Sequence, residues 1–112
     1  MKEIKAMIRP EMFETVYRKL RSAGYCCLTV YSGEGIGKQG DPDKLNATLA
    51  FPFLHSKITK LEILVDDTQE TEVIQIIQQA ACTNNAGDGI IYSTTIDKAV
   101  SIRTGAEGTA VL

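Results

Sequence analysis

Three short segments of the sequence combine glycine with a charged or polar side chain, a combination suited to binding an anion. Residues 33–39 read Gly-Glu-Gly-Ile-Gly-Lys-Gln, residues 87–89 read Gly-Asp-Gly, and residues 102–105 read Ile-Arg-Thr-Gly. Glycine lets backbone N–H groups converge on a phosphate, while Lys38 and Arg103 add positive charge. The spacing fits neither a dinucleotide-binding fingerprint nor a P-loop. Each segment alone has an ordinary explanation as a turn, but the three together favour a phosphate-bearing ligand.

Residues suited to acid–base or metal chemistry are sparse. His55 is the only histidine, and because its neighbours Leu54 and Ser56 suggest no site it is expected to be a loop residue rather than a base. The sequence has no His or Cys pair at metal-ligand spacing and no serine-hydrolase motif. Asp66 and Asp67 precede a predicted helix, where capping accounts for them. The sequence therefore favours a binding protein over an enzyme.

The three cysteines, Cys26, Cys27 and Cys82, include no Cys-x-x-Cys pair. Cys26 and Cys27 fall in a predicted strand, where neighbouring side chains point to opposite faces and cannot readily bridge each other. All three are therefore expected to be reduced thiols, at or near the core of a cytoplasmic protein.

Length and composition indicate one folded domain over residues 1–112, with 44% hydrophobic and 23% charged residues. The 12 Lys and Arg residues are spread along the chain and the net charge is −2, which argues against a nucleic-acid surface. The longest apolar runs are too short to span a membrane, and the first residues do not resemble a secretory signal.

Hydrophobic periodicity predicts the order β-α-β-loop-β-α-β. The expected strands cover residues 2–9, 25–32, 57–66 and 89–95, and the expected helices cover residues 11–23 and a segment capped by Asp67-Thr68 and ending near Ala81. Residues 33–56 show no sustained period and predict a long loop, either functional or mobile. Residues 101–104 are expected to be a short extended piece, and residues 105–112 a tail.

This order is typical of the α+β, ferredoxin-like βαββαβ fold, a four-stranded antiparallel sheet with two helices on one face. The other face of the sheet needs cover, which predicts association of subunits, most simply into a closed ring.

Several segments match one known family at spacings that need no gap. They are Gly-Ile-Gly-Lys-Gln at 35–39, Lys-Leu-Glu-Ile at 60–63, Ala-Gly-Asp-Gly-Ile-Ile at 86–91, Ile-Arg-Thr-Gly at 102–105, and Ile-Arg-Pro at 8–10. The chain resembles the PII signal-transduction proteins, the nitrogen regulatory family, as a divergent member. The resemblance implies a homotrimer that binds ATP or ADP in clefts between subunits. It also implies a non-enzymatic, cytoplasmic regulator of a transporter or nitrogen-metabolism enzyme, acting through the T-loop at about residues 36–56.

The resemblance also assigns roles by position. The residues that would face the phosphates are Gly35, Gly37, Lys38 and Gln39, and those that would hold the phosphates from the other side are Gly87, Asp88 and Gly89. The base would be surrounded by Thr29, Glu62 and Leu64. Arg103 would reach into the site from a neighbouring subunit. Gln39 would also bind Mg²⁺ when 2-oxoglutarate is present.

Three positions depart from the family by losing positive charge. Ile90 stands where the family has a lysine that contacts phosphate, and Ser101 where it often has a second basic residue. Ile58 replaces a basic residue that helps to hold 2-oxoglutarate, and Lys57 is expected to point to the other face of its strand. These changes predict weaker triphosphate binding and argue against 2-oxoglutarate sensing.

The T-loop departs from the family as well. Phe51 replaces a tyrosine that many members modify by uridylylation, and Ala47 replaces an arginine that plugs an ammonium channel. The loop is instead apolar, and the partner-binding residues are expected to be Leu45, Leu49, Phe51 and Phe53.

Two alternatives remain at this stage. The first is a divergent PII-like trimer that senses another small ligand, such as an AMP-type nucleotide or an anion. The second is a metal-binding trimer on the same fold, like the CutA proteins, although the sequence has no clustered His and Cys.

Overall fold

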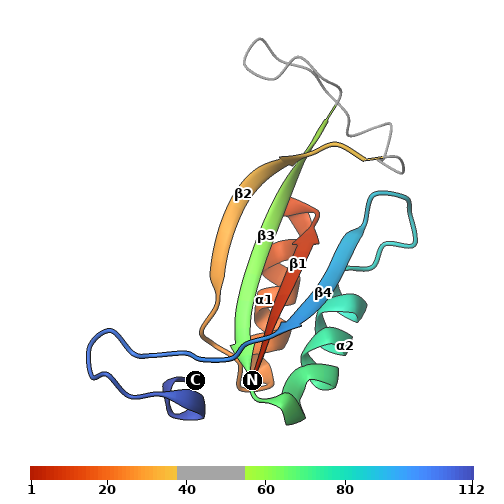
Figure 1. The fold of residues 1–112 in the computed structure, drawn as a ribbon. Coiled ribbons are helices and arrows are strands. Elements are labelled where there is room, and N and C mark those ends of the chain that lie inside the picture. The colour runs from red at the N-terminus through yellow and green to blue at the C-terminus, as the bar shows by residue number, and fades with distance from the viewer. Residues whose placement is uncertain (38–54) are drawn as a thin grey trace.

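The computed structural model describes residues 1–37 and 55–112 and forms one antiparallel sheet from four strands (Figure 1). The spatial order is β2-β3-β1-β4, so the first strand lies in the interior of the sheet between β3 and β4. The strands are β1 (Lys2–Ile8), β2 (Thr29–Gly35), β3 (Ser56–Val65) and β4 (Gly89–Thr95). The predicted ferredoxin-like α+β fold is confirmed.

Two helices, α1 (Phe13–Ser22) and α2 (Glu70–Ala81), pack on the same face of this sheet (Figure 1). The alternation of apolar and charged residues in β1 places Ile4, Ala6 and Ile8 under the helices, all of them buried. The rest of the buried core comes from β3 and the two helices: Leu61, Ile63, Val65, Val16, Leu20, Val73, Ile77 and Ala81.

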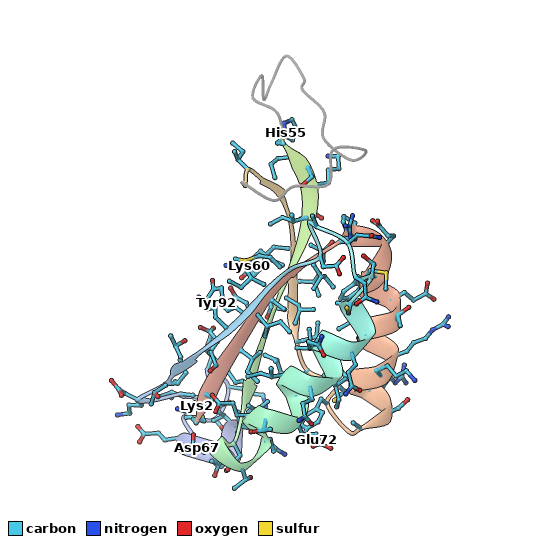
Figure 2. The ribbon with its side chains drawn as sticks, turned by 90° about the vertical axis from the view of Figure 1, so that its right-hand side faces the viewer. Lys2, His55, Lys60, Asp67, Glu72 and Tyr92 are labelled. Atoms are coloured by element: carbon cyan, nitrogen blue, oxygen red, sulfur yellow. The ribbon has the colours of Figure 1, made fainter. Side chains whose placement is uncertain are left out.

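Within residues 1–37 and 55–112, the opposite face of the sheet carries no helix. Antiparallel register puts Lys5 of β1 beside Glu62 of β3 and Tyr92 of β4 on this open face. Figure 2 shows Lys60 and Tyr92 projecting on the side away from the helices. The expectation that one face of the sheet lacks cover within a single chain is therefore correct.

The second strand begins and ends later than predicted. Residues 25–28 have no regular structure, and the strand covers Thr29–Gly35 instead of residues 25–32. The aromatic ring of Tyr25 gave a strand-like signal, but it packs against the core, and its hydroxyl donates to Glu72 on α2. At the other end, Gly33 and Gly35 lie against Ile58 of β3, so pairing with β3 extends the strand into the predicted loop.

Two other local predictions need correction. Of the residues expected to cap the second helical segment, Asp66 does so and Asp67-Thr68 does not: the Asp66 side chain accepts from the Thr68 N–H, and Gln69 reaches back to the Asp66 N–H. The segment 101–104 is a turn and not an extended piece. It is closed by hydrogen bonds from the Ser101 N–H to the Ala106 carbonyl and from the Gly105 N–H to the Ser101 carbonyl.

The cysteines and the histidine also differ from expectation. All three cysteines are free and exposed rather than near the core. His55 is 1% exposed, and its Nε2 lies 3.2 Å from a carboxylate oxygen of Glu34. The acidic partner of His55 therefore comes from β2, the neighbouring strand.

Among the residues that the structure describes, no helix is long and apolar enough to cross a membrane.

Candidate functional site

Five of the residues predicted to hold phosphates line one cleft. Its volume is about 530 Å³, and it lies where the end of β2 meets the loop before β4. The predicted residues in it are Gly35, Gly37, Gly87, Asp88 and Gly89. Two of the predicted glycine-containing segments, more than 40 positions apart in the sequence, are thus brought together at one end of the sheet.

The loop before β4 is held by the carboxylate of Asp88. One oxygen lies 3.0 Å from Nε of Arg9, and the other accepts from the Thr83 N–H at 2.7 Å. Arg9 also donates to the Ala86 carbonyl at 2.7 Å, so one guanidinium ties two points of the loop to the end of β1. The Asp88 side chain therefore fixes the loop, which leaves backbone N–H groups as the part of the loop suited to an anion.

These contacts set the ionisation of Asp88. Burial of the carboxyl opposes its charge, but hydrogen bonds from Thr83 and the charge of Arg9 outweigh that effect and lower the pKa of Asp88 to about 2. The carboxylate is therefore ionised throughout the neutral range and forms an ion pair with Arg9 beside the cleft.

Gly89 is required by packing rather than by a ligand. Its φ is +112°, and a Cβ there would lie 1.8 Å from the Met7 carbonyl oxygen of β1. Gly87 also has a positive φ, at +92°. The ordinary explanation of residues 87–89 as a turn that needs positive φ therefore agrees with the backbone geometry, and it does not depend on any ligand of the cleft.

A second cleft, of about 510 Å³, is lined by the residues predicted to surround the base, Thr29, Glu62 and Leu64. Thr29 and Glu62 are direct partners across β2 and β3. The Glu62 carboxylate lies 3.0 Å from Nζ of Lys60, and its hydrogen bond raises the pKa of Lys60. Cys27 and the C-terminal Leu112 also line this cleft.

The two clefts lie at opposite ends of the open face. Thr29 and Gly35 are the first and last residues of β2, a strand of 7 residues. At a rise of about 3.3 Å per residue they are about 20 Å apart. One chain therefore does not bring the predicted phosphate and base residues together.

Arg103 lies in neither cleft. It is an exposed residue in the turn after β4, and its neighbour Ile102 is fully exposed. A bridge between Val100 and Glu107 closes the base of this turn. Figure 1 shows the segment that follows β4 extending beyond the end of the sheet. Lys38, Gln39 and the predicted partner-binding residues Leu45, Leu49, Phe51 and Phe53 lie outside the described residues.

Two of the three positions where the resemblance implies a lost positive charge line the first cleft, whereas the third, Ser101, is not among its lining residues. Ile58 and Ile90 line it together with Met7 and Ile36. Lys57 points to the other side of β3, as predicted, and its Nζ lies 3.3 Å from Glu34. The cation next to Ile58 in the sequence is therefore directed away from the cleft.

Glu34 was missed by the sequence analysis. It lies between His55 and Lys57, with one carboxylate oxygen near each, and so joins the end of β2 to the start of β3. The opposite charges of Glu34 and Lys57 could have predicted this contact, because the two residues pair across β2 and β3. That pairing is known only from the register of the two strands.

Within residues 1–37 and 55–112, no three His, Cys, Asp or Glu side chains gather as they would around a metal ion.

The ferredoxin-like sheet, with its open face and with glycine-rich loops at one end, defines the class of protein as a small α+β domain. The family model for nitrogen regulatory protein P-II matches residues 1–106. The chain therefore belongs to the P-II family, whose members are signalling regulators.

Similar proteins span nearly the whole chain. The nitrogen regulatory protein P-II of Azospirillum brasilense is 36% identical over 110 residues, covering 96% of each chain. Nitrogen regulatory protein P-II 2 of Methanothermobacter thermautotrophicus is 38% identical over 113 residues, covering 96% of this chain and 94% of that protein. The "Nitrogen fixation nifHD region GlnB-like protein 1" of Methanothermococcus thermolithotrophicus is 36% identical over 96% of this chain and 99% of its own length.

Proposed function

We propose that this P-II protein is a cytoplasmic homotrimer that binds an adenine nucleotide, ATP or ADP, between subunits. Nucleotide occupancy sets the conformation of the T-loop, and the T-loop controls a partner protein, either a transporter or an enzyme of nitrogen metabolism. The protein acts by spending binding energy on a shift between loop states rather than by catalysing a reaction.

The observation that carries this proposal is the separation of the two clefts on one open sheet face. The first cleft, with Gly35 and Gly89, lies at one end of the face and is here called the phosphate cleft. The second cleft, with Thr29 and Glu62, lies at the other end and is here called the base cleft. A neighbouring subunit that covers this face can place its own base cleft against the phosphate cleft of the first chain. A nucleotide site that has both halves would then exist only between two subunits of the assembly.

The open face is suited to burial by another subunit. Its exposed apolar side chains include Tyr31, Leu64 and Ile90. Its charges are already paired within the chain, Lys5 with Glu3 at 3.4 Å and Lys60 with Glu62 at 3.0 Å. Pairing lowers the cost of removing these groups from water when a neighbour covers them.

A second candidate function is favoured by the lining of the phosphate cleft. Ile58 and Ile90 face it where the resemblance would place cations. A nucleotide with fewer negative charges, such as AMP, loses less from this exchange than ATP does. The alternative is therefore the same trimer with an AMP-type nucleotide as its main ligand.

Arg103 provides the test of the nucleotide site, because it is exposed in the turn after β4 and the resemblance assigns it to the cleft of a neighbouring subunit. Replacing Arg103 by Ala should weaken ADP and ATP binding several-fold in isothermal titration calorimetry, with the trimer intact by light scattering. Arg21→Ala, an exposed arginine on the helix layer, is the matched control and should leave affinity unchanged. Equal affinities for Arg103→Ala and the unmodified protein would refute the assignment.

A further inference from the structure

Two adjacent thiols face solvent in the irregular segment that leads into β2. The sulfur atoms of Cys26 and Cys27 lie 3.3 Å apart, and both side chains are exposed. On either side of the pair, Tyr25 and Leu28 pack against the core. The core therefore anchors both ends of the segment, and the thiols project between the anchors.

The absence of a strand is what brings the two sulfurs together. In a strand, neighbouring side chains alternate between faces. Because β2 begins only at Thr29, that alternation does not apply to Cys26 and Cys27. We propose that Cys26 and Cys27 form a redox site, which a low-molecular-weight disulfide oxidises to a vicinal disulfide.

The reaction is a two-step thiol–disulfide exchange. The Cys26 thiolate attacks one sulfur of the external disulfide, forms a mixed disulfide and releases one thiolate. The Cys27 thiolate then attacks Sγ of Cys26, closes the Cys26–Cys27 bond and releases the second thiolate. The two protons lost by the cysteines end on the two released thiols, so the protein loses two electrons and the external disulfide gains them.

The contact between the thiols supports this order of attack. The hydrogen bond with Cys26 raises the pKa of the Cys27 thiol. We therefore assign Cys26 as the attacking thiol, and Cys27 as the resolving thiol that acts once the Cys26 sulfur is bonded to the oxidant.

The bond formed would be easily reduced. Consecutive Cα atoms are about 3.8 Å apart, whereas disulfides usually join Cα atoms about 4.4–6.8 Å apart. Strained, exposed disulfides have more oxidising potentials and are the labile ones. Such a bond suits reversible sensing in a reducing compartment better than it suits structural cross-linking.

Oxidation of the two cysteines would affect nucleotide binding; this coupling rests on the proposed function. Cys27 lines the same cleft as Thr29, Glu62 and Leu64. Drawing the two sulfurs into a bond moves the backbone that leads directly into Thr29. The expected consequence is weaker nucleotide binding in the oxidised protein.

The site itself can be tested by mass spectrometry after treatment with 2-hydroxyethyl disulfide. Trypsin cleaves after Arg21 and Lys38, so both thiols fall in the peptide 22–38, and Cys82 falls in another. The peptide 22–38 should lose two hydrogens, and reducing agent should restore them. Cys82→Ser should behave in the same way, while Cys26→Ser should instead keep a stable mixed disulfide on Cys27.

Two results would overturn the redox site: two mixed disulfides on the peptide 22–38, or a bridge from that peptide to Cys82. The coupling is tested separately by titrating ADP into the reduced and oxidised proteins, with several-fold weaker binding expected after oxidation. Equal affinities would refute the coupling. If ADP binds neither form, the proposed function fails, whereas the mass change still decides the redox site.

Discussion

At the residue scale, Asp88 has a structural role that its sequence context does not indicate. Glycines on both sides predict a residue that holds a phosphate, yet its carboxylate is used by Arg9 and Thr83. The sequence does not reveal this, because Arg9 is 79 positions away and reaches Asp88 only after β1 and β4 pair. Gly87 and Gly89 line the first cleft, and the acid between them holds the loop in place; contact of these residues with a phosphate stays a prediction.

Replacing Asp88 by Asn should destabilise the fold at neutral pH. The shift of its pKa from 3.8 to about 2 corresponds to about 2 kcal/mol, and partial exposure of the side chain reduces the expected loss to about 1–2 kcal/mol. Urea unfolding at pH 7 and fixed protein concentration measures this difference.

The pH dependence gives the control for Asp88→Asn. Because the folded pKa of Asp88 is lowered, its stabilising effect is present above about pH 4 and is lost as the pH falls towards about 2. The difference between the two proteins should shrink over that window. A constant difference would mean that the substitution acts through packing alone.

Ile90 tests the charge balance of the phosphate cleft. It is 60% exposed and lines the cleft with Ile58. Ile90→Lys should raise affinity for ATP more than for AMP, because the added charge acts most strongly on the more highly charged ligand. Calorimetry on Ile90→Gln, polar but uncharged, separates charge from polarity. Equal gains for both nucleotides would count against this placement of the phosphates.

At the scale of elements, the predictions succeed where hydrophobic period and turn residues agree. The fourth strand covers residues 89–95 as predicted, between a glycine turn and a polar segment. The second strand was misplaced because residues 33–35 contain two glycines, which favoured a loop. Pairing with β3 overrides that local preference, and such pairing is a long-range property that periodicity does not carry.

Gly89 provides the sharpest test of an element boundary. Gly89→Ala places a Cβ 1.8 Å from the Met7 carbonyl in addition to a strained φ, so the start of β4 must separate from β1. We expect a loss of several kcal/mol of stability, or failure to fold, in urea unfolding. Gly105→Ala shares a positive φ but meets no atom within 4 Å, and should cost only about 1–2 kcal/mol. Similar losses for both variants would show that steric contact at Gly89 does not matter.

At the scale of the whole molecule, the uncovered sheet face links fold to function. The sequence predicted this face correctly, because two helices and four strands leave one side of a sheet without a layer. It could not show which residues meet at each end of the face, since that depends on the register of β1, β2 and β3. That register separates the two clefts and makes the assembly the unit expected to bind a nucleotide.

The last prediction concerns that assembly. Tyr92 is 39% exposed on β4 and projects from the open face (Figure 2). Tyr92→Glu would bury a new negative charge beneath a neighbouring subunit without disturbing the helix-covered core, so it should reduce the trimer to smaller species. Thr15→Glu adds the same charge to an exposed position on α1 and should leave the trimer intact. Light scattering at micromolar concentration measures both variants. A monomer for the unmodified protein, or a trimer that tolerates Tyr92→Glu, would mean that subunits do not associate through this face, and the nucleotide site would then have to be completed in another way.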